Sequence, residues 1–189
     1  MAQISTNEFR PGVKLEVDGQ PWVIVANEFV KPGKGQAFNR VKIKNLITGR
    51  TIERTYKSGD KENLADVEET KMRLLYRDGQ DAVLMSDTTY EQLTVPHSAL
   101  GDVEQWLKED TLYDVILYKG NPISIEAPTF MELQVTECDP GVRGDTASGK
   151  VLKPAVTETG ARVQVPIFID QGEVCKFDTR TGEYVSRVK

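Results

Sequence analysis

Short segments in which polar and apolar residues alternate, each ended by a turn dipeptide, dominate this chain. Residues 13–17 read Val-Lys-Leu-Glu-Val and lead into Asp18 and Gly19, a pair that favours a two-residue hairpin turn. Further turn dipeptides stand at 48–49, 78–79, 119–120, 171–172 and 181–182. Because side chains of a strand point alternately to its two faces, this pattern predicts an all-β chain of many short strands. Such chains build barrels or sandwiches.

Only one segment has the spacing of a helix. Ser98 is its expected N-cap, and apolar residues follow at intervals of three and four over about two turns. These apolar residues are Leu100, Val103, Trp106 and Leu107. A shorter helical turn is expected at 61–64.

Charge is distributed unevenly along the chain. The net charge of −5 would argue against a nucleic-acid partner if it were spread evenly over the surface. Residues 1–64 carry 11 basic and 7 acidic side chains, residues 65–129 carry 5 and 13, and residues 130–189 carry 8 and 9. The chain therefore has a basic first third and a strongly acidic middle.

The steps in charge favour three units of about 60 residues, a size at which small barrels still fold. Pro128, between Ala127 and Thr129, is interpreted as the second domain boundary, because proline stops strands and is common in linkers. The expected domains are 1–64, 65–128 and 129–189.

Several classes of protein are disfavoured. The longest apolar run is about five residues, whereas a membrane helix needs about 20, and no secretory signal is read at the start. Cys138 and Cys175 are expected to be reduced, buried thiols, and His97 a surface or turn residue. These three residues are too few for a zinc site, so no metal or cofactor is expected. The chain is interpreted as cytoplasmic, without a membrane partner.

A Pro-Gly-Lys-Gly sequence lies between two segments with strand patterning. Pro32 fixes one φ angle, while Gly33 and Gly35 permit positive φ on either side of Lys34. We expect a tight hairpin tip from which one lysine projects, on an extended arm at 22–30 that spans up to about 30 Å. The alternative is an ordinary hairpin whose lysine only keeps the tip soluble.

The segment from Lys31 to Lys57 is strongly basic, because Glu53 is its only acidic residue. Its basic residues are Lys31, Lys34, Arg40, Lys42, Lys44, Arg50, Arg54 and Lys57. Such a cluster in an acidic protein predicts a surface that contacts phosphates, although a solvated strand face remains an alternative. Only Phe38 and Tyr56 are aromatic there, which favours backbone contact to structured RNA over stacking of single-stranded bases.

Residues 144–150 come close to a nucleotide-binding P-loop. Val151 stands where a Ser or Thr should hold Mg²⁺, and Pro154 follows where a helix should run. NTP hydrolysis is therefore not expected. The segment 139–146 is better interpreted as a long glycine-rich loop, a type of loop that often binds a partner.

The segment 153–172 combines Lys153 and Ala155 with a glycine, an aliphatic residue, Val-Pro, two apolar residues and the closing Gly172. This combination resembles the signature of the bacterial elongation factor P family. The resemblance covers the whole chain, and its other motifs lie at 7–10, 32–35, 139–141, 144–146 and 182–187. No motif of the family is broken.

This resemblance implies an SH3-like, KOW-type barrel followed by two OB-fold barrels, in an L shape similar to tRNA. It also implies a monomer that binds the 70S ribosome and its rRNA between the P and E sites. There it would stabilise the P-site peptidyl-tRNA and stimulate peptide-bond formation at consecutive prolines. The protein would not be an enzyme.

Roles for individual residues follow from the same resemblance. Lys34, in the loop formed by Pro32, Gly33, Lys34 and Gly35, resembles the residue that enters the peptidyl-transferase centre beside the CCA end. That residue is often extended by a modifying enzyme, commonly by β-lysylation. The residues expected to contact tRNA or rRNA phosphates are Lys31, Arg40, Lys42, Lys44 and Arg54.

Two further groups of residues resemble family contacts in the last third of the chain. Gly144, Asp145 and Thr146 resemble a loop that approaches the mRNA codon in the E site. Tyr184 and Arg187 resemble residues placed near the P-site tRNA and the small subunit. Three alternatives remain open: a general RNA-binding module, an NTPase that uses 144–150, and a paralogue of the same fold with another substrate.

Overall fold

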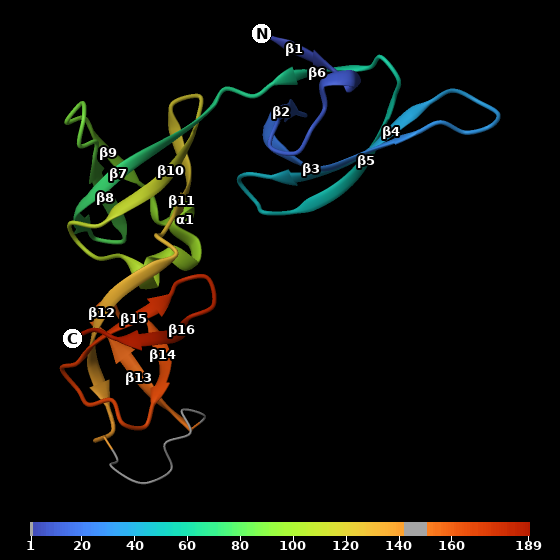
Figure 1. The fold of residues 1–189 in the computed structure, drawn as a ribbon. Helices are drawn as coiled ribbons and strands as arrows, with labels where there is room; N and C mark the ends of the chain where they lie inside the picture. Colours follow the sequence, from blue (N-terminus) through green and yellow to red (C-terminus); the bar gives the residue numbers. More distant parts are fainter. Residues whose placement is uncertain (1, 142–150) are drawn as a thin grey trace. The chain divides into compact units, whose positions relative to one another are not determined.

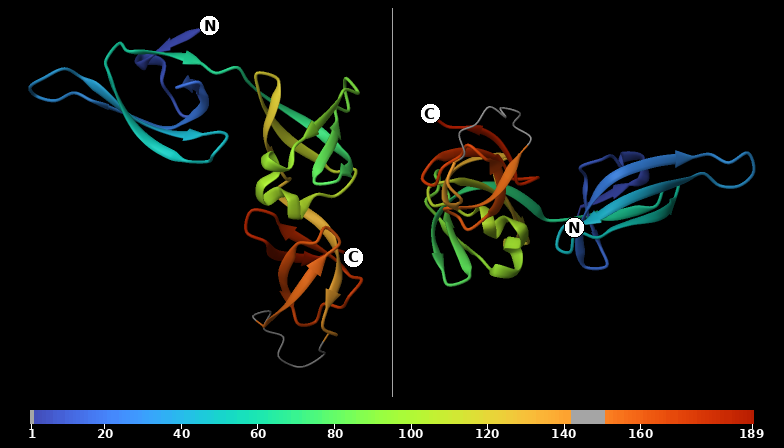
Figure 2. Two further views of the ribbon diagram at one scale, coloured as in Figure 1. Left: turned by 180° about the vertical axis from the view of Figure 1, so that it is seen from behind. Right: turned by 90° about the horizontal axis from the view of Figure 1, so that it is seen from below.

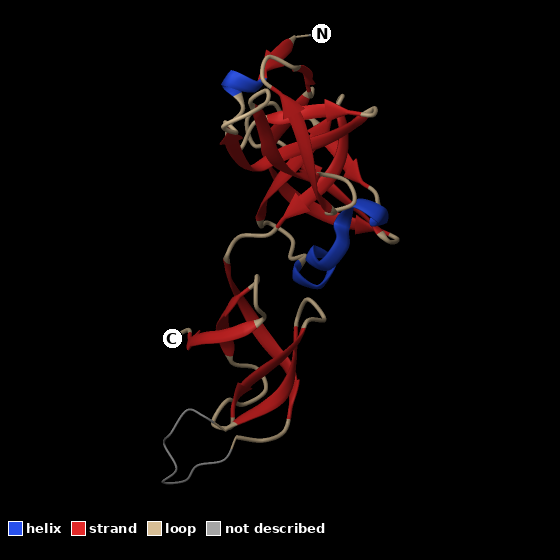
Figure 3. Ribbon diagram, turned by 90° about the vertical axis from the view of Figure 1, so that its right-hand side faces the viewer, coloured by secondary structure: helices blue, strands red, loops and turns tan. Residues whose placement is uncertain are grey.

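The computed structural model describes residues 2–141 and 151–189 of the chain, and in this part strands are the dominant element (Figure 1, Figure 3). The helices are one four-residue α-helix and two short 3-10 segments. The predicted all-β class is therefore confirmed. No helix in these residues is both long enough and apolar enough to cross a membrane.

The first sheet has six antiparallel strands in the order β1-β6-β2-β3-β4-β5. Its strands are β1 (Gln3–Ser5), β2 (Lys14–Val17), β3 (Gln20–Val30), β4 (Phe38–Asn45), β5 (Thr51–Lys57) and β6 (Lys61–Leu64). A 3-10 turn, η1 (Thr6–Glu8), follows β1. β6 occupies the segment at which a helical turn was expected. That expectation was wrong, because Lys61, Glu62 and Asn63 pair with the edge strand β1 and take extended backbone conformation.

Alternation along β4 separates an apolar core from a charged surface. Val41 and Ile43 are fully buried, whereas Arg40, Lys42 and Lys44, which alternate with them, are exposed. The core also holds Leu15, Val17 and Ile24, together with Phe9, whose ring meets Tyr56 edge to face at 5.3 Å. The strand pattern in the sequence thus decides which face of this sheet meets solvent.

The second sheet has the order β11-β10-β7-β8-β9. Its strands are β7 (Val67–Asp78), β8 (Asp81–Met85), β9 (Gln92–Val95), β10 (Leu112–Tyr118) and β11 (Asn121–Glu126).

The expected helix is only partly formed. α1 (His97–Leu100) covers one turn, and a 3-10 helix, η2 (Gly101–Trp106), continues it. Pro96 occupies the N-cap position and Ser98 lies inside the helix, so the assignment of Ser98 as the cap was wrong. Gly101 adopts φ +53°, which interrupts regular α-helix there. The predicted surface position of His97 is confirmed, because half of its side chain is exposed.

The last third forms a closed barrel in the order β12-β13-β14-β16-β15 (Figure 2). Its strands are β12 (Phe130–Cys138), β13 (Leu152–Thr157), β14 (Arg162–Pro166), β15 (Val174–Asp178) and β16 (Glu183–Arg187). Leu133, Val135 and Phe177 are fully buried in its core, and Trp106 from η2 belongs to the same cluster. The 3-10 helix η2 therefore adds an aromatic ring to the core of the barrel.

Both cysteines are free thiols, as expected, but only one is fully buried. Cys175 has no exposed surface, and burial raises the pKa of its thiol to about 11. Cys138 is half-buried, with its Sγ 3.7 Å from the carbonyl oxygen of Ile169.

By compactness the chain divides into two units, Met1–Thr70 with Val115–Ser124, and Lys71–Asp114 with Ile125–Lys189. One contact explains why part of the β10–β11 hairpin groups with the first sheet. Tyr118 Oη donates to Glu16 Oε2 at 2.7 Å, and Lys119 Nζ lies 3.2 Å from the same oxygen. These two hydrogen bonds, that of Tyr118 first, hold the pKa of Glu16 below its ordinary value. The three domains expected from the sequence stay a prediction.

Phe177→Ala is expected to destabilise the protein by about 3–5 kcal/mol, because it opens a cavity in a fully packed barrel core. Urea unfolding followed by circular dichroism measures the change. Phe130→Ala is the matched control, since the Phe130 ring is 47% exposed and lies 5.1 Å from Lys176 Nζ. Its loss should cost no more than about 1 kcal/mol. Equal effects for the two variants would contradict the assignment of Phe177 to the core.

Candidate nucleic-acid interface

The loop that carries Lys34 projects beyond the end of the first sheet (Figure 1). Val30 and Phe38 form the last strand pair, so residues 31–37 make the connection between β3 and β4. This loop is longer than the tight tip expected, because Pro32 has no N–H with which to continue the ladder. Gly35 adopts φ +112°, whereas Gly33 does not reach positive φ, so one of the two expected glycine conformations is found.

Lys34 is exposed at this loop, and so are its neighbours Gly33 and Gly35. Among the residues that the structure describes, no carboxylate lies within 4.0 Å of the ammonium of Lys31 or Lys34. Both charges are therefore available to a partner, and neither is used to hold the loop together.

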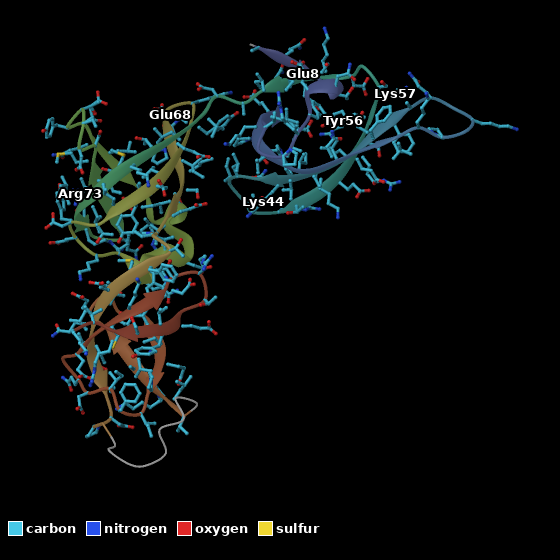
Figure 4. The ribbon with its side chains drawn as sticks, in the orientation of Figure 1. Glu8, Lys44, Tyr56, Lys57, Glu68 and Arg73 are labelled. Carbon is cyan, nitrogen blue, oxygen red and sulfur yellow. The ribbon has the colours of Figure 1, made fainter. Side chains whose placement is uncertain are left out.

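Next to the loop, the outer surface of β4 and β5 carries a row of basic side chains. In strand register, Lys42 stands opposite Glu53, Arg40 opposite Thr55, and Phe38 opposite Lys57. Residues paired in this way share a face, so Lys57 joins the face that bears Arg40, Lys42 and Lys44. We call these four residues the basic face. Figure 4 shows Lys44 on β4 and Lys57 at the end of β5.

The four cations of the basic face are not equally available. Arg40 lies 3.7 Å from Glu28 on β3 and 3.5 Å from Glu53 on β5, so two carboxylates share its charge. Within the described residues, Lys42, Lys44 and Lys57 have no acidic partner within 4.0 Å. The uncompensated charge is therefore carried by three lysines.

Arg54 does not share this face. It stands opposite Val41, whose side chain points into the core, and its guanidinium lies 3.4 Å from Asp18. The same guanidinium lies 5.9 Å from the centre of the Tyr56 ring. Of the five residues expected to meet phosphates, the structure groups Arg40, Lys42 and Lys44 on one face, with Lys31 in the adjoining loop.

From the sequence, Lys57 was counted among the basic residues but not among the expected phosphate contacts. Glu28 was not recognised as an acidic partner of Arg40. The parity of β5 would have revealed Lys57, since it lies four residues after Glu53 and therefore on the same face. Glu28 lies on a separate strand, so only the β3–β4 register shows that it opposes Arg40.

Two residues of the last barrel that were expected to contact tRNA or the small subunit, Tyr184 and Arg187, make contacts within the protein itself. Tyr184 is half-buried and meets Phe177 edge to face at 6.4 Å, and burial raises the pKa of its hydroxyl. Arg187 pairs with Glu173, and its guanidinium lies 5.8 Å from the centre of the Phe168 ring. Gly144, Asp145 and Thr146, like the P-loop-like segment 144–150, lie outside the described residues.

The described residues contain no group of three or more His, Cys, Asp or Glu side chains that could hold a metal ion. The charges at the loop and on the basic face suit contact with an anionic backbone, because exposed lysines neutralise phosphates without requiring a fixed sequence of bases.

Comparison with protein families finds three models along the chain. An elongation factor P KOW-like domain matches residues 5–61, an elongation factor P OB domain matches 67–125, and an elongation factor P C-terminal domain matches 131–187. Together the three models cover nearly the whole sequence.

Curated relatives agree over the full length. The chain is 60% identical over 188 residues to "Elongation factor P 2" of Protochlamydia amoebophila (strain UWE25), covering 100% of this chain and 99% of the relative. Identity and coverage are the same with "Elongation factor P 2" of Chlamydia trachomatis serovar D.

Solved structures with a similar fold include "Eukaryotic translation initiation factor 5A from Methanococcus jannaschii". That likeness has a TM-score of 0.55 at 24% identity and covers 67% of this chain and 92% of that chain. At such low identity it concerns the fold alone. On the three family models and the full-length relatives, the chain belongs to the elongation factor P family.

Proposed function

We propose that this translation elongation factor binds the ribosome between the P and E sites, stabilises the P-site peptidyl-tRNA and stimulates peptide-bond formation at consecutive prolines. The observation that carries the proposal is the exposed Lys34 on a projecting loop, next to the basic face. Family membership supports the role in elongation, and the charge arrangement supports contact with RNA.

In this proposal the basic face and Lys34 have different roles. The lysines of the basic face bind phosphates of the tRNA acceptor stem or rRNA, an interaction that orients the protein without reading sequence. Lys34 then reaches past the end of the sheet toward the CCA end of the tRNA. Its ammonium donates charge-assisted hydrogen bonds to phosphate or sugar oxygens there.

The benefit to the reaction is orientation. Proline is a hindered nucleophile, and a polyproline chain holds its ester in a poor position for attack. Placing two reactants correctly can lower a barrier by several kcal/mol, about 7–11 kcal/mol in the best intramolecular cases. The protein thus acts by binding and positioning, and it needs no proton transfer or cofactor of its own.

The remaining parts of the proposal concern the rest of the chain. We assign the KOW-type domain to 1–64 and the OB-type domains to 65–128 and 129–189. The segment 144–146 is proposed to approach the mRNA codon in the E site, and Tyr184 and Arg187 the P-site tRNA and small subunit. The expected place of action is the cytoplasm.

Lys34 is also the proposed target of a lysine-modifying enzyme. An extension of its side chain would lengthen the reach of a donor that already lies outside the sheet. Intact mass of the protein purified from its own host, followed by mapping of the peptide that contains Lys34, tests this directly. An unmodified mass would remove the modifying enzyme from the proposal.

Toeprinting on an mRNA with consecutive proline codons tests the proposed function. Without the protein, ribosomes should pause at the second or third proline codon, and addition of the protein should release them. A general RNA-binding module would bind ribosomes without relieving the pause. Persistence of the pause at saturating protein would overturn the proposal.

A further inference from the structure

Two asparagines lie at the point where the apolar core of the first sheet ends. On the inner face of β4, Val41 and Ile43 are fully buried, and the next inward residue toward the loop is Asn39, only 4% exposed. On β3 the corresponding inward residue is Asn27, which pairs in register with Val41. The next inward residue of β3 toward the loop is Phe29, the partner of Asn39, and it is already 57% exposed. Asn39 is therefore the last buried residue of β4 before the loop that carries Lys34, and its amide contacts that of the half-buried Asn27.

These amides form a chain of hydrogen bonds with a fixed direction. Asn39 Nδ2 donates to Asn27 Oδ1 at 2.9 Å, and Asn27 Nδ2 donates to the carbonyl oxygen of Phe9 at 2.9 Å. The Phe9 ring packs edge to face on Tyr56, which is the β5 partner of Asn39. Together these contacts link β3, β4 and β5 to Phe9, the residue that follows η1.

Asn27 and Asn39 are polar residues at the border of an apolar core, where apolar residues are more common. An apolar pair would bury as much surface without the cost of desolvating two amides. Hydrogen bonds add directionality, because they weaken steeply when distance or angle departs from the optimum. The register shift between Ile24 and Ala26 bends β3 just below the pair, where a strand without such a link could take more than one direction.

Asn45 is a second buried asparagine of β4, and its side-chain oxygen shapes a turn. It lies at the other end of β4, is 1% exposed, and accepts the backbone N–H groups of Ile47 and Thr48 at 2.8 and 2.9 Å. Its amide also donates to Gln20 at 2.6 Å. The Asn39–Asn27 pair caps no turn, and its bonds lead from β4 through β3 to the Phe9 carbonyl at the opposite end of the strand from Asn45.

We propose that Asn27 and Asn39 are positioning residues for Lys34. Their link to Phe9 sets the angle at which the end of the β3–β4–β5 sheet, and with it the loop 31–37, leaves the core. The inference rests on the proposed function, since it assigns a purpose to that angle: delivery of Lys34 to the CCA end. A small error in the angle at the base becomes a larger displacement at Lys34.

The test separates binding from stimulation. With Asn39→Ala, affinity for ribosomes should stay within about threefold of the unaltered protein, because the basic face is untouched. The maximal rate of Pro-Pro-Pro synthesis at saturating protein should fall at least about tenfold, since misplacement near 1 Å can cost as much as about a hundredfold. Asn27→Ala, at a half-buried site, should act in the same direction, and the double variant should lose little more.

Asn45→Ala is the matched control, because it removes an equally buried amide from the same strand. It should lower stability and leave the maximal rate unchanged. An equal loss of rate in Asn45→Ala, or a normal rate in Asn39→Ala, would overturn the inference. So would a loss in Asn39→Ala that appears only in ribosome affinity.

A second readout does not depend on activity. Residual dipolar couplings of the backbone amides at 29–38, measured on the full-length labelled protein, should fit the rest of the first sheet in the unaltered protein. They should cease to fit it in Asn39→Ala. If Lys34→Ala kept full stimulation, the proposed function would fail while these couplings still tested the positioning. Unchanged couplings would overturn the positioning alone.

Discussion

Replacing Lys34 by alanine is expected to reduce the stimulation of Pro-Pro-Pro synthesis at least about tenfold, equivalent to about 1.4 kcal/mol of barrier, while the protein stays folded. The side chain is exposed and makes no ion pair with a described residue, so its loss should change stability by no more than about 0.5 kcal/mol. A reconstituted translation assay measures the rate, and urea unfolding measures the stability.

Lys61→Ala is the matched control for Lys34→Ala. Lys61 is also exposed and lies in the same compact unit, but on β6, away from the loop 31–37. It should keep full stimulation. If Lys34→Ala relieved the proline pause as well as the unaltered protein, the assignment of Lys34 would be wrong. A loss rescued merely by lower salt would favour the general RNA-binding alternative.

The double variant Lys42→Ala/Lys44→Ala is expected to weaken ribosome binding and to make it less sensitive to salt. Each lysine that neutralises a phosphate contributes about one unit to the slope of log K against log salt, so the slope should become shallower by about 2. Both side chains are exposed on β4, and stability should be nearly unchanged. Binding titrations at several salt concentrations measure the slope.

Lys61→Ala/Lys71→Ala removes the same charge from other strands and controls for net charge. Its salt slope should match that of the unaltered protein. Arg40→Ala should have a smaller effect than either lysine, because Glu28 and Glu53 already share the charge of Arg40. A salt slope that is unchanged in the double lysine variant would remove the basic face from the interface.

Much of the architecture could be predicted from local patterns. Alternation over 13–17 and 41–44 corresponds to β2 and β4, and Leu15, Val17, Val41 and Ile43 of these segments are buried. Such alternation can be recognised in the sequence, because the two-residue period of side-chain directions is set by the backbone of the strand itself. The exposed position of Lys34 was predicted from turn chemistry, because Pro32, Gly33 and Gly35 favour a hairpin tip at this point.

Other features depend on tertiary contacts that compete with local conformational preference and that a local pattern does not show. Residues 61–64 became a strand because the edge of β1 offered them partners. The segment 97–106 became mostly 3-10 helix, in which Gly101 interrupts the turn and Trp106 packs into the core of the closed barrel. In both cases tertiary contacts outweighed a weak local preference.

The sequence by itself determined most of the strands, the position of Lys34 between Gly33 and Gly35, and the concentration of basic residues from Lys31 to Lys57. Tertiary structure alone decided which charges remain free. Strand register brought Glu28 beside Arg40, turned Arg54 toward Asp18, and placed Lys57 with Lys42. It also joined Asn27 to Asn39. The physical reason is that cross-strand neighbours are set by pairing between segments that lie far apart along the chain, and charge and hydrogen bonding depend on those neighbours.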